Sequence, residues 1–419
     1  MTLGTWSAFI LTIVALAAYW LLPVRMRTAV LILASYAFYT VAFPAYALLL
    51  AALTLATYFV GIRVRRDRDS ADRILLAAGV TGALVVLGVF KYAAFIAGAV
   101  GSLATRFSLG FSVPVPAIVA PLGISFITFG LIHFLAEMRK GDAPEPGFWE
   151  YVSYVSFFPT VVSGPIKRYR DFVADARSVP ARLAGSDWAY GLWRILLGLF
   201  RKFVIADTIG VLTEPLLKAQ TGTPLLVLAV YAYAFKIYFD FAGYSDIAIG
   251  TARLFGYHIM ENFNGPYLRR NISEFWRNWH ASLTRFITDY IYIPLGGSRR
   301  GQLRVALNTL VAMGLSGLWH GPALHYIAWG LWHGVGLAVL RLWRQAAAAL
   351  RVRFPWLDRT AESRVGRAAS YGFGWFVTFN YVALGWVLFV LPVGKSLAVY
   401  RAFAGYVFEV IRRVVGFVL

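Results

Sequence analysis

The chain of 419 residues contains no cysteine and only six histidines, and charged residues make up just 14% of it. The absence of cysteine excludes disulfides, thiolate metal sites and a cysteine acyl-enzyme intermediate. Soluble domains carry roughly a quarter charged residues, whereas 59% of this chain is hydrophobic. These shortages predict a protein built for a lipid bilayer.

Acidic residues are also scarce, because 20 of them stand against 40 lysines and arginines, for a formal net charge of +20. In a soluble protein such an excess would suggest nucleic-acid binding. Here the basic residues gather between apolar runs, which is the distribution typical of cytoplasmic loops. We therefore expect no nucleic-acid partner, and we expect the charge to set the membrane topology and to contact anionic lipid headgroups.

Eleven apolar runs are candidate membrane crossings. They are Trp6–Leu22, Thr28–Phe43, Tyr46–Gly61, Ile74–Ala97, Ala117–Leu135, Trp188–Leu212, Leu225–Gly250, Leu303–Trp319, Leu324–Leu340, Ala368–Leu391 and Leu397–Ile411. Basic clusters follow the first, third and fifth runs, and they share one side of the membrane if the N-terminus lies outside and the C-terminus inside the cell. The sequence thus predicts an all-α, polytopic membrane protein, with residues 1–419 as a single domain.

Two further stretches are too short or too polar to cross. Tyr151–Val162 has basic residues before and after it and runs into Ser163-Gly164-Pro165. Ile272–Leu295 mixes charged side chains with tryptophan, phenylalanine and tyrosine. We expect Tyr151–Val162 to be a re-entrant or interfacial element, because broken backbone at membrane depth is tolerated only when it is buried in protein or faces water. We expect Ile272–Leu295 to lie along the membrane plane.

Two histidines stand out in this apolar setting. His280 ends the segment Trp276-Arg277-Asn278-Trp279-His280, and His320 lies in Gly317-Leu318-Trp319-His320-Gly321-Pro322. An imidazole near hydrocarbon is costly unless it is paired, hydrated or functional, and it is well suited to moving protons near neutral pH. In acyl transfer to a hydroxyl, His320 would be the base, and His280 would orient the acceptor, polarise the acyl carbonyl or hold water. The alternative is that both rings are hydrogen-bonded interior residues.

The run Leu225–Gly250 also contains ionisable side chains. Lys236 and Asp240 are one helical turn apart and can neutralise each other. Asp246 has no obvious local partner and is a candidate site residue. The three together would suit a relay in a transporter or flippase, which is the alternative function, although the chain shows no inverted repeat. No metal-ligand spacing or nucleotide-binding loop is found, so we expect no metal and no tightly bound cofactor.

Several motifs together resemble the membrane-bound O-acyltransferase family. They are Asn262-Phe263-Asn264, Glu274-Phe275-Trp276 through His280, Asp289-Tyr290-Ile291-Tyr292 with Leu295-Gly296-Gly297, and Gly317-Leu318-Trp319-His320-Gly321. The chain looks most like the bacterial branch that modifies extracytoplasmic polymers. Within that branch, alginate O-acetyltransferases and teichoic-acid D-alanyltransferases are the two types that it resembles.

The resemblance implies a bacterial inner-membrane enzyme whose helices surround a central funnel. It implies that His320 is the essential histidine and His280 its companion, and the motif residues Trp319, Trp279, Trp276 and Asn264 are candidate substrate contacts. An acyl group would move from a cytoplasmic thioester, either acetyl-CoA or an acyl carrier protein, to an extracytoplasmic acceptor for modification of an envelope polysaccharide or related glycopolymer. A serine hydrolase-like partner outside would take part. Acetyl is favoured over D-alanyl, because acetyl-CoA needs no dedicated carrier.

Overall fold

The computed structural model describes residues 5–42, 44–66, 69–218, 223–299, 301–356 and 363–418. Regular secondary structure in these ranges is helical, with no strand, as the all-α prediction requires. Phe43, the end of the second expected crossing, lies outside the described residues. The chain divides into two compact units, one made of Met1–Phe200 and Ala242–Glu261, the other of Arg201–Phe241 and Asn262–Leu419.

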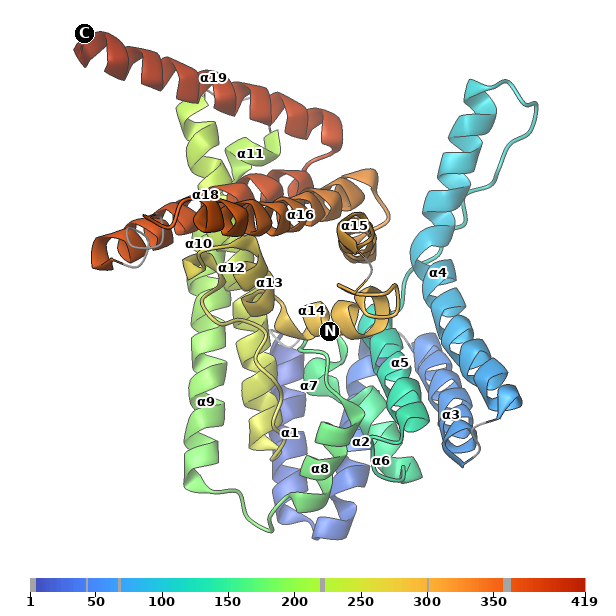
Figure 1. The fold of residues 1–419 in the computed structure, drawn as a ribbon. Coiled ribbons are helices and arrows are strands. Elements are labelled where there is room, and N and C mark those ends of the chain that lie inside the picture. Colours follow the sequence, from blue (N-terminus) through green and yellow to red (C-terminus); the bar gives the residue numbers. More distant parts are fainter. Residues whose placement is uncertain are drawn as a thin grey trace. The chain divides into compact units, whose positions relative to one another are not determined.

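The first unit contains the N-terminal helices, of which α3, α4 and α5 pack against one another (Figure 1). Its helices are α1 (Trp6–Leu21), η1 (Val24–Met26), α2 (Arg27–Ala42), α3 (Pro44–Arg66), α4 (Ser70–Arg106), α5 (Ile124–Lys140), α6 (Phe148–Ser156), α7 (Phe158–Val161), α8 (Tyr169–Ser178) and α9 (Gly185–Leu199). The C-terminal part of α12 (Thr223–Leu254) also belongs to it.

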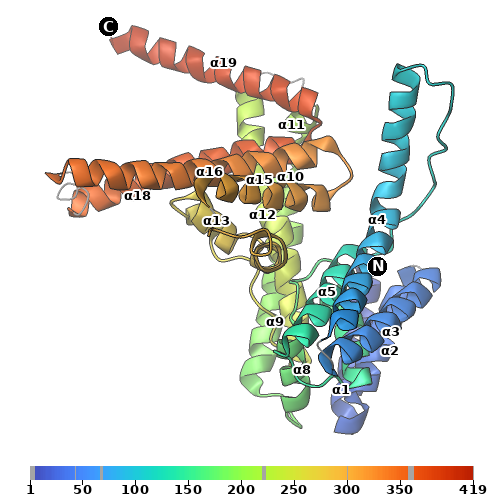
Figure 2. The ribbon, with the colours of Figure 1, turned by 45° about the vertical axis from the view of Figure 1, so that its right-hand side comes forward.

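The second unit carries both motif histidines and is built on α15, α16 and α18, with α16 packed against each of the other two (Figure 2). Besides the start of α12, its helices are η2 (Phe200–Ala206, of which Phe200 belongs to the first unit), α10 (Asp207–Leu212), α11 (Glu214–Lys218), η3 (Pro266–Leu268), α13 (Ile272–Asn278), α14 (Ala281–Ile287), η4 (Thr288–Tyr292), α15 (Gly301–His320), α16 (Leu324–Arg353), α18 (Arg364–Val390) and α19 (Val393–Val418).

Four helices among the described residues are long and apolar enough to cross a membrane: Pro44–Arg65, Ser70–Arg106, Pro224–Leu254 and Arg364–Val390. The expected count of eleven crossings is therefore not confirmed. Two of the expected crossings are not formed by one continuous α-helix. Ala117–Leu135 becomes helical only at Ile124, because Pro121 lacks the amide donor that a helix interior needs. Trp188–Leu212 is divided among α9, the π-helical η2 and α10.

The two stretches expected to be re-entrant or interfacial are both interrupted in the structure. Tyr151–Val162 is interrupted at Phe157, whose backbone (φ −42°, ψ 99°) separates α6 from α7. Ile272–Leu295 forms three short helical pieces, α13, α14 and η4, instead of one long helix. The second break is functionally important, because His280 occupies the junction between α13 and α14.

Helices α15 and α16 approach each other through glycine. A Cβ atom on Gly317 would lie 2.1 Å from the carbonyl oxygen of Tyr326, and one on Gly330 would lie 2.2 Å from the carbonyl oxygen of Met313. Only a residue without a side chain allows such backbone-to-backbone contact. The close crossing brings the C-terminal turn of α15, which ends at His320, against the first turns of α16.

Candidate active site

His280 is held by an unusual backbone conformation between two short helices. α13 begins after Asn271, whose side chain accepts a hydrogen bond from the amide of Glu274 at 3.0 Å, and it ends at Asn278 before the extended residue Trp279. His280 then adopts φ 44° and ψ 51°, in the left-handed region. For a residue with a side chain this costs roughly 1–2 kcal/mol, so the surrounding structure must hold the turn in place.

Asn262 determines which nitrogen of the neutral His280 ring carries the proton. Its Oδ1 accepts hydrogen bonds from the amide of Ser282 at 3.2 Å and from its hydroxyl at 2.8 Å, and it lies 3.3 Å from Nδ1 of His280. Because the amide of Ser282 can only donate, Oδ1 is an acceptor, and Nδ1 of His280 must donate to it. Nε2 of His280 is then the unprotonated nitrogen, and it is buried with no hydrogen-bond partner among the described residues.

Burial also keeps the His280 ring neutral. Its side chain is 1% exposed, and loss of hydration lowers its pKa to about 3. His280 therefore offers a lone pair at neutral pH, but its surroundings oppose a lasting positive charge. The neutral ring has one hydrogen-bond acceptor, Nε2.

His320 lies in a different environment. It is the last residue of α15 and is partly exposed. Its ring contacts Trp329 and Phe389 edge to face, each with centroids 5.0 Å apart. The C-terminal end of a helix carries partial negative charge and stabilises a nearby cation by about 0.3–1 kcal/mol. His320 is thus better placed than His280 to accept a proton and carry the resulting charge.

Trp319 joins the two histidines. Its ring centroid lies 5.9 Å from that of His280 and 4.7 Å from that of His320. The two motifs that the sequence singled out therefore meet in one place. The sequence motifs predict both histidines as site residues, but they do not predict that the indole of Trp319 contacts both rings.

A cavity of about 560 Å³ lies between α13, α14, η4, α15 and α16, and neither His280 nor His320 is among the residues of its wall. Its volume is in the range of small-molecule binding sites. Its wall is formed by Ser273, Trp276, Arg277, Leu283, Thr284, Ile287, Thr288, Tyr292, Val305, Thr309, Ala312, Met313, Ser316, Leu337, Leu340, Arg341, Arg344, Gln345 and Ala348. Ser316 is one helical turn before His320, so the cavity extends along α15 toward that histidine.

Charge in the cavity is all of one sign. Arg277, Arg341 and Arg344 line it, and the described lining residues include no aspartate or glutamate. Nε of Arg341 is buried without a hydrogen-bond partner in the described part of the chain. Such a site favours a ligand that combines an apolar body with negative charge.

The predicted tryptophan contacts and Asn264 lie in different environments. Trp276 lines the cavity and contacts Trp329 with centroids 5.7 Å apart. Trp279 instead packs on Trp386 at 4.8 Å and does not line the cavity. Asn264 is exposed and donates its backbone amide to the carbonyl of Asn278 at 3.1 Å. The residue of its motif that contacts a histidine is Asn262, which sequence reasoning included in the motif but did not select.

Asp246 belongs to the first unit and has a partner. Its Oδ1 lies 2.6 Å from a guanidinium nitrogen of Arg194 in α9, and that arginine also pairs with Glu261. Its partner Arg194 is distant in the sequence and lies in another helix that the fold brings next to it. The guanidinium of Arg194 thus offsets the charge of the buried carboxylate, and it is shared with Glu261.

The pair Lys236 and Asp240 is confirmed, with 3.1 Å between Nζ and Oδ2. Lys202, from η2, joins the same carboxylate as a second cation. This triad holds η2 against α12. In the described part of the chain, no three histidine, aspartate or glutamate side chains gather as a metal site.

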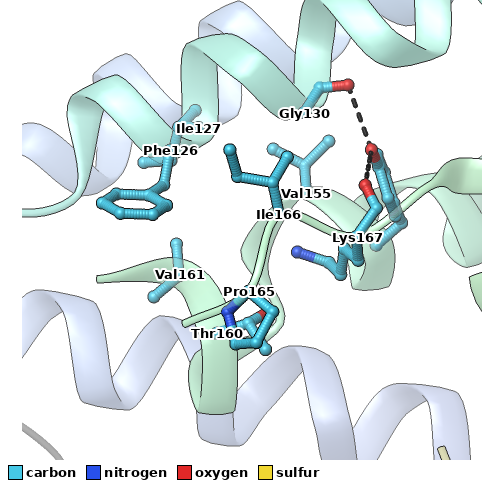
Figure 3. Close-up of a pocket in the computed structure, with 10 residues that line it drawn as sticks. Phe126, Ile127, Gly130, Val155, Thr160, Val161, Pro165, Ile166 and Lys167 are labelled. Carbon is cyan, nitrogen blue, oxygen red and sulfur yellow. Dashed lines mark hydrogen bonds between the residues drawn. The ribbon is translucent and has the colours of Figure 1, made fainter. Parts of the chain in front are cut away.

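A second hollow lies in the first unit, between α5, α6 and the Pro165–Lys167 segment (Figure 3). The hydroxyl of Tyr154 lies 3.1 Å from the carbonyl oxygens of both Gly130 and Lys167. The hollow measures about 10 Å³, which is room for about one water molecule. It is too small for an acyl donor.

Comparison with known proteins connects this geometry to a family. The model of the membrane-bound O-acyltransferase family matches residues 136–357, which include both histidines and every residue of the cavity wall. The probable alginate O-acetylase AlgI of Pseudomonas aeruginosa is 36% identical over 91% of this chain and 70% of its own length. The peptidoglycan O-acetyltransferase of Helicobacter pylori is 31% identical over 86% of this chain and 70% of its own length.

The teichoic acid D-alanyltransferase of Streptococcus thermophilus is 33% identical over 64% of this chain and 68% of its own length. These relatives are acyltransferases by name, and the transporter alternative is not favoured. The protein is accordingly an acyltransferase of the membrane. On the family match and on the extent of these similarities, the chain belongs to the membrane-bound O-acyltransferase family.

Proposed function

We propose that this protein moves an acetyl group from cytoplasmic acetyl-CoA to a hydroxyl outside the bacterial inner membrane, for esterification of an envelope polysaccharide or related glycopolymer. Residues 1–419 act as one functional domain, with the N-terminus outside the cell and the C-terminus in the cytoplasm. The observation that carries the proposal is the cavity lined by three arginines, whose wall is formed by α14, which follows His280, and by α15, which ends at His320.

The cavity suits a coenzyme A thioester in both shape and charge. Coenzyme A combines several phosphate charges with a long, weakly polar pantetheine arm. Arg277, Arg341 and Arg344 supply donors for phosphate, and the apolar wall suits the arm. Arg341 and Arg344 begin a stretch, residues 341–367, that contains seven arginines and that the positive-inside rule predicts to be cytoplasmic. The end of the cavity at Arg341 and Arg344 is therefore the cytoplasmic end, where the donor enters.

In the proposed reaction His320 is the general base. One of its ring nitrogens takes the proton of the acceptor hydroxyl as the hydroxyl oxygen attacks the thioester carbon. The new C–O bond forms, the C–S bond breaks, and the proton passes to the departing thiolate to give free coenzyme A. The end of α15 stabilises the transient imidazolium.

His280 orients the acceptor in this scheme. Because Nδ1 donates to Asn262, Nε2 can accept a hydrogen bond but cannot donate one to the acyl carbonyl. Of the roles considered for His280, holding the hydroxyl is therefore the one that its surroundings favour. Trp319, in contact with both rings, fixes their separation.

The names of the relatives support the choice of acceptor. Their names specify alginate, peptidoglycan and teichoic acid, all of which are extracytoplasmic polymers. We infer an envelope glycopolymer as the final acceptor here, reached directly or through a serine hydrolase-like partner on the outer side. D-alanyl transfer from an acyl carrier protein is the alternative, and its donor would present the pantetheine arm without the nucleotide.

The test uses the purified full chain in lipid nanodiscs, with labelled acetyl-CoA and, separately, with labelled D-alanyl carrier protein. We expect acetyl transfer, and we expect Arg341→Ala and Arg344→Ala to raise the KM for acetyl-CoA by roughly 10- to 100-fold each, from the loss of one charge-assisted hydrogen bond. Arg353→Ala is the matched control, because this arginine is exposed on the same helix and outside the cavity.

The outcomes separate the alternatives. Transfer from the carrier protein alone, with unchanged kinetics in the arginine variants, would replace acetyl-CoA as the donor. Transfer from neither donor would overturn the proposed function. An equal KM increase in Arg353→Ala would remove the cavity arginines from donor recognition.

A further inference from the structure

His333 is a second buried histidine near the site, and the proposed reaction has no use for it. It lies in α16 with 0% exposure, and neither ring nitrogen has a hydrogen-bond partner among the described residues. A buried polar group left unpaired destabilises a protein substantially. Simple packing would place an apolar side chain here, so the imidazole itself needs an explanation.

Two indoles beside His333 share the same feature. The ring of Trp276 lies 5.0 Å from the imidazole at an interplanar angle of 90°, and the ring of Trp329 lies 5.1 Å away at 72°. The Nε1–H groups of both tryptophans are also buried without a partner in the described structure. One imidazole and two indole donors, all unpaired, thus meet in one cluster.

The chemistry of these groups points to one small ligand. A water molecule accepts two hydrogen bonds and donates two, so it can take both indole N–H groups and donate to an unprotonated nitrogen of His333. Buried waters typically make about three hydrogen bonds to otherwise unpaired polar groups. The three side chains present this set of donors and acceptor.

The cluster is connected to the proposed site on two sides. Trp329 contacts the ring of His320 with centroids 5.0 Å apart at 89°, and Trp276 forms part of the cavity wall. We propose that His333 is a positioning residue which, through a bound water, fixes Trp329 against His320 and Trp276 against the donor cavity. The inference deepens the proposed function and rests on it for the role of His320.

The first test is thermodynamic and independent of activity. His333→Leu replaces the imidazole with an apolar side chain of similar size. If the imidazole were merely an unpaired buried group, this change would remove a penalty and raise the unfolding temperature in nanodiscs. If a water joins the three side chains, the substitution His333→Leu removes one of its partners, leaves the two indole donors unpaired and lowers the unfolding temperature. His333→Gln retains an acceptor and should restore most of the loss. A raised unfolding temperature in His333→Leu overturns the proposal.

The second test uses the pH dependence of acetyl transfer. We expect His333→Leu to lower kcat by about tenfold, as misplacement of a reacting group does, with the KM for acetyl-CoA changed much less. The acid limb of the kcat profile, which reports His320, should shift in His333→Leu and return in His333→Gln. His258→Leu, an exposed histidine of the first unit, is the control. If His333→Leu changes neither kcat nor the acid limb of the pH profile, the positioning role is overturned. If neither the unmodified protein nor any variant transfers acetyl, the proposed function fails, and the thermodynamic test still decides whether His333 binds a water.

Discussion

Nδ1 of His280 lies 3.3 Å from Oδ1 of Asn262, and this contact decides which nitrogen of the ring carries the proton. The amide and hydroxyl of Ser282 also donate to that oxygen, so its role as an acceptor is fixed by the fold. The lone pair of His280 is consequently on Nε2, the buried nitrogen that has no partner among the described residues. A left-handed backbone turn and an asparagine together fix the orientation of this ring.

The first prediction concerns that asparagine. Asn262→Ala removes the acceptor for Nδ1 and frees the ring to change tautomer, so we expect acetyl transfer to slow by roughly 10- to 100-fold. Asn264→Ala provides the comparison, because the side chain of Asn264 is exposed. Single-turnover transfer rates in nanodiscs would measure both. Equal losses in the two variants would contradict the assignment of the tautomer to Asn262.

His320→Ala should abolish transfer while leaving expression and folding intact. The reason is that general base catalysis typically contributes about 10²- to 10⁴-fold, and His320, partly exposed at the end of α15, is the ring best able to carry the proton. Transfer of labelled acetyl is the measurement. His258→Ala is the control, because it removes a histidine of the first unit that pairs with Asp175. Retained turnover in His320→Ala would remove its role as the base.

The sequence predicted the parts of this site whose signals are local. His280 and His320 each follow a tryptophan in a motif, and Lys236 and Asp240 are one turn apart, so spacing alone was sufficient for them. The short length of Tyr151–Val162 and the charge on both sides of it predicted an element that does not cross the membrane, although not the position of its interruption at Phe157. Each of these features is set by residues that are neighbours in the chain.

Contacts between distant segments could not be predicted in the same way. The partner of Asp246 is Arg194, from another helix, and the cavity is formed by side chains of five separate helical elements. Trp276 and Trp279 share a motif, but the extended backbone at Trp279 turns its ring onto Trp386 and away from the cavity. The periodicity of apolar residues predicts which face of a helix is buried, but it does not predict which other segment packs against that face.

Stability should depend on pH through His280. Burial lowers its pKa from an ordinary value near 6.5 to about 3, so between these values the unfolded chain binds a proton that the folded protein does not. The free energy of unfolding therefore falls as the pH falls from about 6.5 toward 3, by up to about 1.4 kcal/mol per pH unit. Thermal unfolding of the purified protein between about pH 7.5 and pH 4.5 measures this slope.

The matched variant for this measurement is His280→Asn. Asparagine tolerates the left-handed backbone conformation of this position better than most residues, and it does not titrate. The variant should therefore lose stability less steeply on acidification than the unmodified protein. Identical slopes for the two proteins would show that His280 is not the group responsible.

The crossing of α15 and α16 should be intolerant of a single methyl group. Gly330→Ala would place Cβ 2.2 Å from the carbonyl oxygen of Met313, and because backbone cannot move aside as a side chain can, the two helices must separate. We expect a loss of about 1–3 kcal/mol in the free energy of unfolding and slower transfer, since His320 and Trp329 meet across this crossing. Gly314→Ala is the control on α15, because its Cβ would meet only Leu331 Cδ2, at 3.5 Å. Thermal unfolding and transfer assays on both variants measure the effect, and similar behaviour of the two would mean that the glycine contact does not position His320.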